Sequence, residues 1–300
     1  MRRLGLAAAV LALLAAGARA EDEPTPPPVG AGSPPPAAAA PAPASGGDDD
    51  DLELDPSEPD FTVITLPTTL RLPRHKLAFR LTHRFTRSLG QGDFGDLLAD
   101  FFGFDSSARI GLELRFAAFS GNQLGVYRTS DRTIELFASQ SVLRSARAPV
   151  GLAVHASIEG LDNFSESYSP SLGVVVSRRL GSRGAVYLHP SWVGSVRLGG
   201  GSGDEDSWLV GFGARLRISS TVYLVGETVP RLGGYKGTSS EDPSRRAPHH
   251  ASFGIEGRAG GHSFQLNFSN GFATTPAQVA RGGRNGDDWF IGFNISRKFF

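Results

Sequence analysis

Residues 77–85 read Leu-Ala-Phe-Arg-Leu-Thr-His-Arg-Phe, and this stretch decides the class of fold. Apolar side chains fill nearly every second position, and arginine or another small or polar residue stands between them. Residues 109–116, Arg-Ile-Gly-Leu-Glu-Leu-Arg-Phe, repeat the pattern. Because successive side chains of a strand point to opposite faces, this alternation predicts strands with one apolar and one polar face.

The same period of two continues along the rest of the chain. Further strands are predicted at 150–158, 172–176, 186–192, 208–218, 222–224, 251–255, 264–268 and 289–295, with weaker segments near 123–129 and 132–144. Together with 75–86 and 109–116 they make twelve. An even number of antiparallel strands is typical of closed bacterial barrels. The expected fold class is therefore all-β: an antiparallel, up-and-down transmembrane β-barrel of about 12 strands.

The connections between these strands alternate in length. Short turns are predicted at 120–122, 145–149, 181–184, 219–220 and 260–261, and long loops at 88–108, 159–170, 199–206, 231–248 and 271–287, with one short exception at 130–131. Outer-membrane barrels have short turns on the periplasmic rim and longer loops outside. The N-terminal segment and the C-terminus both fall on the short-turn side, which we therefore expect to face the periplasm.

The direction of each face follows from solvation. An Arg or Lys facing hydrocarbon at the bilayer midplane costs about 2–4 kcal/mol, so we expect the apolar stripe to face lipid and the polar stripe to face the lumen. The alternative is a soluble lipocalin-like barrel with its apolar face inside. The residues expected to line the lumen are Arg80, Arg84, Arg109, Glu113, Arg115, Glu135, His155, His189, Arg215, Arg217, Glu227, Glu256 and Arg258. The aromatic residues expected at the lipid interface are Trp192, Trp208 and Trp289.

Residues 1–20 have the pattern of a secretory signal peptide. Two arginines precede an apolar run too short to span a bilayer, and Ala18 and Ala20 fit a small-x-small cleavage site. A lone N-terminal anchor helix is the alternative. Residues 21–60 are rich in proline and alanine and carry 11 acidic but no basic residues, which predicts a disordered, solvated linker. Residues 61–300 form the predicted barrel domain, with 27 basic and 19 acidic residues.

Several kinds of chemistry are excluded or disfavoured. The chain has no cysteine, so disulfides, thiolate metal sites and cysteine nucleophiles are ruled out. The acidic run at 48–51 lacks the turn glycine and ligand spacing of a calcium loop, no HExxH motif occurs, and neither a metal nor a cofactor is predicted. Basic residues alternate along strands instead of clustering with exposed aromatics, which disfavours nucleic-acid binding.

The sequence Gly90-Gln-Gly92-Asp-Phe-Gly95 fits the pattern GxGxxG. A dinucleotide site would need this loop inside a βαβ unit, and the surrounding strands alternate with no crossover helix. We expect instead a first loop whose short apolar helix, within 93–102, packs on the rim or folds into the barrel mouth.

One enzyme class stays open. Outer-membrane phospholipases with twelve strands use a Ser–His pair on the outer wall, and His83 is a histidine of outward parity in a clear strand middle. No GxSxG elbow accompanies it. No catalytic residue is predicted.

Six segments together resemble a bacterial β-barrel family of unknown function: HRFTRSLGQGDFGD, FFGFDSSARIGLELRF, GVYRTSDRTIELFASQSVLR, GETVPR, HSFQLNFSNGFATTPAQVARGG and NISRKFF. The resemblance covers about 75–300. It implies an outer-membrane barrel in a Gram-negative bacterium, inserted by the barrel-assembly machinery and surrounded by the lipid bilayer. It supplies no catalytic residues.

The lumen stripe is the predicted functional feature. Its excess of arginine could leave a positive field that favours small anions, or opposite charges and bulky aromatics could close it. The first outcome predicts a porin-like channel or binding barrel for a small polar or anionic solute. The alternatives are a plugged structural barrel that anchors periplasmic partners through the linker, and a lipid hydrolase.

Overall fold

The computed structural model describes residues 56–143, 150–198, 205–237, 246–283 and 288–300. The predicted signal peptide with its Ala18 and Ala20, and residues 21–55 of the predicted linker, lie outside these ranges. Across the described ranges, no helix is long and apolar enough to cross a membrane.

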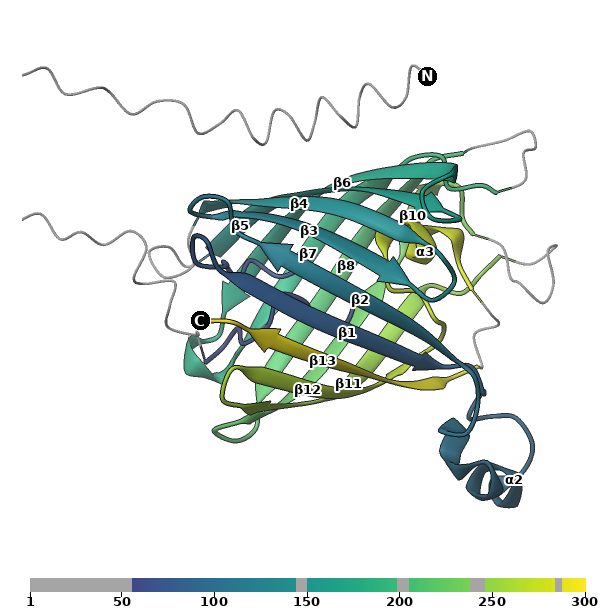
Figure 1. Ribbon diagram of the computed structural model, residues 1–300. Helices are drawn as coiled ribbons and strands as arrows, with labels where there is room; N and C mark the ends of the chain where they lie inside the picture. Colours follow the sequence, from purple (N-terminus) through teal and green to yellow (C-terminus); the bar gives the residue numbers. More distant parts are fainter. Residues whose placement is uncertain (1–55, 144–149, 199–204, 238–245, 284–287) are drawn as a thin grey trace, which may run out of the picture.

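The described residues form a closed antiparallel barrel (Figure 1). From β1 to β8 and from β11 to β13 each strand pairs with the next in sequence, β9 joins β8 to β11, and β13 pairs with β1 to close the wall. The strands are β1 (Leu77–Phe85), β2 (Ala108–Phe116), β3 (Asn122–Thr129), β4 (Ile134–Leu143), β5 (Val150–Leu161), β6 (Glu166–Arg179), β7 (Gly184–Val193), β8 (Ser207–Arg217), β9 (Val222–Val229), β10 (Arg231–Gly234), β11 (His250–Ala259), β12 (His262–Ser269) and β13 (Phe290–Lys298).

Two of these labels belong to one strand of the wall. β8 pairs with β9 through Phe212↔Thr228 and with β10 through Arg231↔Leu209. Pro230 separates β9 from β10, because proline has no N–H to give to the ladder. Within the described residues the barrel therefore has twelve wall strands, as the alternation predicted.

The side chains are arranged inside out relative to a soluble protein. Across the β1–β2 pair, Leu81 stands opposite Leu112 and Arg80 opposite Glu113, so each face keeps one chemical character. Leu112 is 49% exposed, whereas Arg80 and Glu113 are buried. Large apolar residues are exposed in the same way along the other strands, as a lipid-facing surface requires. This arrangement contradicts the soluble lipocalin-like alternative.

One predicted long loop is much shorter than expected. The segment 159–170 is mostly strand, since β5 extends to Leu161 and β6 begins at Glu166. The register shifts between Glu159 and Leu161, so the pair continues past an irregularity that interrupts the alternation. The turn itself, with positive φ at Asp162, Asn163 and Phe164, occupies 162–165.

The connections at the long-loop end carry the larger helices. α2 (Phe94–Ala99) and the 3₁₀ turn η2 (Phe101–Gly103) follow β1, and α3 (Pro276–Arg281) follows β12. A second 3₁₀ turn, η3 (Gly181–Arg183), lies at the short-turn end. Figure 1 shows α2 projecting beyond the ends of β1 and β2, and α3 tucked against the barrel, both away from the C-terminus.

Residues 56–72, here called the plug, lie inside the barrel instead of outside it. Nearly all of them are buried, and their contacts come from strands around the whole circumference. A tight turn forms at the tip, where the N–H of Val63 donates to the carbonyl of Leu66 at 2.8 Å. Residues 56–60, which the composition assigns to the linker, are the first part of this buried segment.

Candidate functional site

The wall arginines of β1 and β2 share a single carboxylate. Arg80 Nη2 lies 2.6 Å from Glu113 Oε2, and Arg115 Nη2 lies 2.7 Å from Glu113 Oε1. The register explains this contact, because Arg80 is the direct partner of Glu113, and Arg115 follows two residues later on the same face. The three buried side chains form a row with one positive charge in excess.

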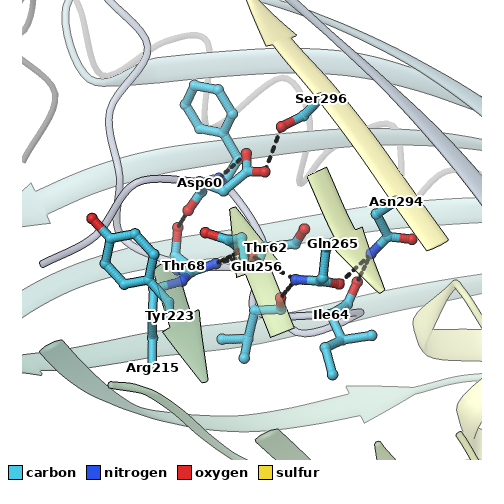
Figure 2. Close-up of polar contacts among 12 residues, drawn as sticks. Asp60, Thr62, Ile64, Thr68, Arg215, Tyr223, Glu256, Gln265, Asn294 and Ser296 are labelled. Carbon is cyan, nitrogen blue, oxygen red and sulfur yellow. Dashed lines mark hydrogen bonds and ion pairs between the residues drawn. The ribbon is translucent and has the colours of Figure 1, made fainter. Parts of the chain in front are cut away.

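A second ion pair lies across β8 and β11. Arg215 Nη2 is 2.8 Å from Glu256 Oε2, and neither side chain is exposed. Gln265 of β12 donates to the same carboxylate oxygen at 3.1 Å (Figure 2). Charges removed from water need such partners, since a buried ion left alone costs several kcal/mol.

These wall side chains also hold the backbone of the plug tip. Arg215 donates to the carbonyl of Thr62 at 2.8 Å and Gln265 to that of Val63 at 2.6 Å (Figure 2). The carbonyl of Ile64 accepts hydrogen bonds from Asn294 Nδ2 at 3.2 Å and from Arg80 Nη1 at 3.3 Å. Side chains of the wall thus donate the hydrogen bonds that the backbone of a neighbouring strand would donate in a β-sheet.

Glu227 of β9 binds the other side of the tip. Its carboxylate accepts the backbone N–H groups of Ile64, Thr65 and Leu66 at 2.9–3.0 Å, and also the Thr65 hydroxyl. His250 Nε2 lies 3.3 Å from the same carboxylate. Hydrogen bonds to a charged acceptor are about twice as strong as neutral ones, and this one carboxylate accepts bonds from three successive residues of the plug.

The plug is also tied to the wall nearer the short-turn end. Asp60 accepts a hydrogen bond from Ser296 and lies 3.6 Å from Lys298 Nζ. Burial by itself would raise the pKa of the Asp60 carboxyl, but Lys298, the hydrogen bond from Ser296, Arg215 and the Phe61 N–H together hold that pKa below its usual range. The Thr69 hydroxyl is 2.5 Å from that of Ser177 on β6.

α3 packs against the plug and the inner wall at the long-loop end. Arg231 donates to the carbonyls of Val279 and Ala280 at 2.6–3.1 Å, satisfying groups that a helix C-terminus leaves without partners. Arg281 forms an ion pair with Glu159 of β5. One buried apolar cluster includes Val63, Ile64 and Leu66 of the plug together with Ala277, Val279 and Ala280 of α3. The two inserts therefore share a core inside the barrel.

A cavity remains at the long-loop mouth, here called the outer vestibule. Its volume is about 540 Å³. The Arg109 guanidinium lies 5.2 Å from the centre of the Phe272 ring and 3.5 Å from Asp131. The lining residues are Arg109, Asp131, Thr133, Leu161, Leu198, Phe272, Ala273, Gln278, Arg281, Gly282 and Gly283.

The predicted lumen residues fall into two groups by depth. The ten that are buried are Arg80, Arg84, Glu113, Arg115, Glu135, His155, His189, Arg215, Glu227 and Glu256. Three lie at strand ends with more exposure: Arg109 lines the outer vestibule, Arg217 donates to the carbonyls of the 219–220 turn, and Arg258 donates to the Tyr223 hydroxyl. Parity predicts the face of a residue but not its depth.

Three buried polar side chains on β4, β5 and β7 have incomplete hydrogen bonding. The rings of His155 and His189 are 6.2 Å apart between centroids. Among the described residues, Glu135 Oε1, His155 Nδ1 and His189 Nε2 have no hydrogen-bond partner. No group of three or more metal-ligating side chains occurs in the described part of the chain.

The three tryptophans all lie at the long-loop end of the barrel. Trp192 and Trp208 are register partners on β7 and β8, and Trp208 is 58% exposed. Trp289 immediately precedes β13 and packs on the Phe253 ring at 5.3 Å. Their interfacial role stays a prediction.

His83 lies among aromatic rings. Its imidazole stacks on Phe293 at 4.7 Å and contacts Phe85 at 4.4 Å. Among the contacts of the described residues, none joins His83 to a serine, and its Nδ1 has no partner. The Ser–His geometry that a lipid hydrolase needs is not observed there.

The family comparison decides what kind of protein this is. The family model described as "Membrane bound beta barrel domain (DUF5777)" matches residues 60–299. The chain belongs to this family. The match begins within the plug and ends one residue before the C-terminus, so the family's domain contains the inserted segment as well as the wall.

Several solved outer-membrane proteins are similar in shape. The COG4313 outer membrane channel from Pseudomonas putida F1 has 13% identity and a TM-score of 0.48, over 76% of this chain and 97% of that chain. Omp33 of Acinetobacter baumannii has 8% identity and a TM-score of 0.43, over 77% and 100%. The KdgM porin in complex with oligogalacturonate has 6% identity and a TM-score of 0.44, over 75% and 99%. No curated protein sequence matches.

Sequence reasoning missed the plug, α3 and Arg231. The signal for the plug was the run Phe-Thr-Val-Ile-Thr-Leu at 61–66, which is apolar and β-branched yet precedes the first wall strand. Arg231 shares inward parity with Glu227, and that parity continues across Pro230.

Proposed function

We propose that the protein is an outer-membrane channel of the porin type that is closed by its own plug and passes small polar, preferentially anionic solutes when the plug is displaced. The observation that carries this proposal is the chemistry of the wall side chains that bind the plug. The tip of the plug is held mainly by charged and amide side chains that bond to its backbone. Water can replace each of these bonds, so a vacated lumen would hydrate readily.

The charge balance supports anion preference. The thirteen predicted lumen residues comprise seven arginines, four glutamates and two histidines. Glu58 and Asp60 of the plug bring two carboxylates into the same space. Because the plug also carries Arg71, its displacement would remove one net negative charge and leave the wall with an excess of positive charge, which attracts anions.

The outer-membrane location and orientation belong to the same proposal. The exposed apolar wall requires a bilayer, and the predicted signal peptide supports export. With short turns on the periplasmic side, the plug would enter from the periplasm and the outer vestibule would face outward. The vestibule, with Arg109 beside Phe272, would be the first solute contact.

A static, structural barrel is the second candidate. It is favoured by the apolar cluster that the plug and α3 share, because displacing the plug would expose Val63, Ile64 and Leu66. In that case the linker would anchor periplasmic partners and the lumen would never open. We propose no enzymatic activity.

Conductance separates the two candidates. The full-length protein, refolded in detergent and inserted in a planar bilayer, should show a closed baseline with brief openings. Under a salt gradient, the reversal potential of these openings should indicate anion preference, and Arg115→Gln should weaken it. A correctly folded protein that stays silent under all voltages would favour the static barrel.

A further inference from the structure

The loop after β1 exposes an unusual amount of apolar surface. We call residues 94–104, which comprise α2 and η2, the rim lobe. Phe94 is 71% exposed, Phe101 62% and Leu98 55%, and α2 buries none of its residues. Large apolar side chains gathered in this way mark a surface that contacts a partner or a membrane.

The rim lobe is held in a defined position. Asp93 caps α2 and forms a capping box with Asp96. The buried Arg87 pairs with Asp100 at 2.5 Å and donates to the carbonyls of Ser88 and Gln91. These contacts fix the direction in which the phenylalanines project.

The apolar surface of the lobe is continuous with the lipid-facing wall. The ring of Phe104 contacts that of Phe85 at 4.7 Å. Phe85 in turn contacts His83 and Phe293, which belong to the outward-facing stripe of β1 and β13. An unbroken chain of rings thus leads from the wall to the lobe.

The loop that leads from β1 to the rim lobe contacts Trp289, the residue just before β13. The N–H of Leu89 donates to the carbonyl of Trp289 at 2.7 Å, and the Trp289 ring packs on Phe253 of the outer wall. Tryptophan is enriched where acyl chains meet headgroups. Figure 1 shows α2 beyond the ends of β1 and β2.

We propose that the rim lobe is a membrane anchor that inserts Phe94, Leu98 and Phe101 into the headgroup–acyl boundary of the bilayer around the barrel. Phenylalanine and leucine on one side of a short helix are typical of interfacial segments. Asp93, Asp96 and Asp105 would remain in the aqueous layer. The lobe widens the barrel's footprint at its long-loop rim and stabilises its depth in the bilayer.

A single fluorophore tests the insertion, because the chain has no native cysteine. Leu98→Cys, labelled with the polarity-sensitive dye NBD, is reconstituted in vesicles of phosphatidylethanolamine and phosphatidylglycerol. Phe94→Cys is a second site on the lobe. Ser130→Cys, on the exposed turn between β3 and β4 at the same rim, is the matched control.

Lipids spin-labelled near the headgroup should quench the dye at 98 and 94 at least twice as strongly as the dye at 130, and aqueous iodide should show the reverse order. Equal quenching at all three sites would overturn the proposal. Quenching that disappears when the protein is diluted with lipid would also overturn it, because the lobe would then contact a second copy. Folding of each variant is checked by its resistance to unfolding in cold detergent.

Discussion

The substitution Glu227→Gln tests whether the plug can leave the barrel lumen. The carboxylate accepts three backbone N–H groups of the plug tip, and a glutamine keeps one acceptor oxygen and places an NH₂ group where the other stood. Hydrogen bonds to a charged group are worth about 1.5–3 kcal/mol, against about 0.5–1.5 kcal/mol for neutral ones. Loss of the charge and of one acceptor should therefore weaken docking of the plug by about 2 kcal/mol.

At about 1.4 kcal/mol per tenfold change, 2 kcal/mol corresponds to a roughly 30-fold rise in the ratio of open to closed channels. The assay is the open probability of single channels in a planar bilayer. Glu135→Gln is the matched control, since Glu135 is an equally buried wall glutamate with no observed bond to the plug. If the Glu227 variant folds and keeps the wild-type open probability, the plug is not an exchangeable gate and the reasoning fails.

Three further predictions follow from the same contacts. Arg215→Leu leaves the buried Glu256 without a counter-charge, so the free energy of unfolding in urea should fall by about 3–5 kcal/mol, and adding Glu256→Leu should restore part of it; a double variant no more stable than the single one would refute this. Arg231→Met removes the donors to Val279 and Ala280, so hydrogen exchange over 276–281 should accelerate, while Arg217→Met should leave it unchanged; equal exchange in both variants would be contrary evidence. Because the pKa of Asp60 is lowered in the folded protein, its tie to the wall is present above the ordinary value of 3.8 and weakens as the pH falls below it. Acid should therefore raise the open probability in the wild type, and by less in Asp60→Asn, which keeps the Glu227 carboxylate as an acid-sensitive contact with the plug; an equal rise in both proteins would contradict this role of Asp60.

The wall could be predicted from sequence because its physics is local. Alternation assigns a face to each residue, and the cost of an Arg in lipid decides which face turns inward. Leu112 and Glu113, adjacent in sequence, accordingly differ in exposure as expected. The strand count was accessible for the same reason, although Pro230 divides one strand into two segments.

The plug could not be predicted, because its partners are far away in sequence. Ile64 binds Glu227 across 163 positions, and no local period signals that contact. The segment also follows directly on a proline- and acid-rich stretch, so composition extends the linker to residue 60. α3 depends likewise on the shape of a lumen that exists only after the wall has closed.

Strand parity predicts the face on which a residue lies, but not its depth along the barrel. Arg84 and Arg109 share inward parity, yet Arg84 is fully buried and Arg109 is half-exposed in the outer vestibule. Depth along the barrel depends on register and loop packing, neither of which alternation encodes. Sequence therefore predicts which side chains face the barrel interior but not which parts of that interior are occupied.

A reversible cross-link between plug and wall tests the central claim most directly. The hydroxyls of Thr69 on the plug and Ser177 on β6 are 2.5 Å apart, so Thr69→Cys with Ser177→Cys places two thiols within reach of a disulfide. The oxidised double variant should be silent in a planar bilayer, and reductant should restore anion-selective openings, while either single variant behaves like the wild type. Equal conductance before and after reduction would contradict the account, because ions would then pass with the plug fixed in place.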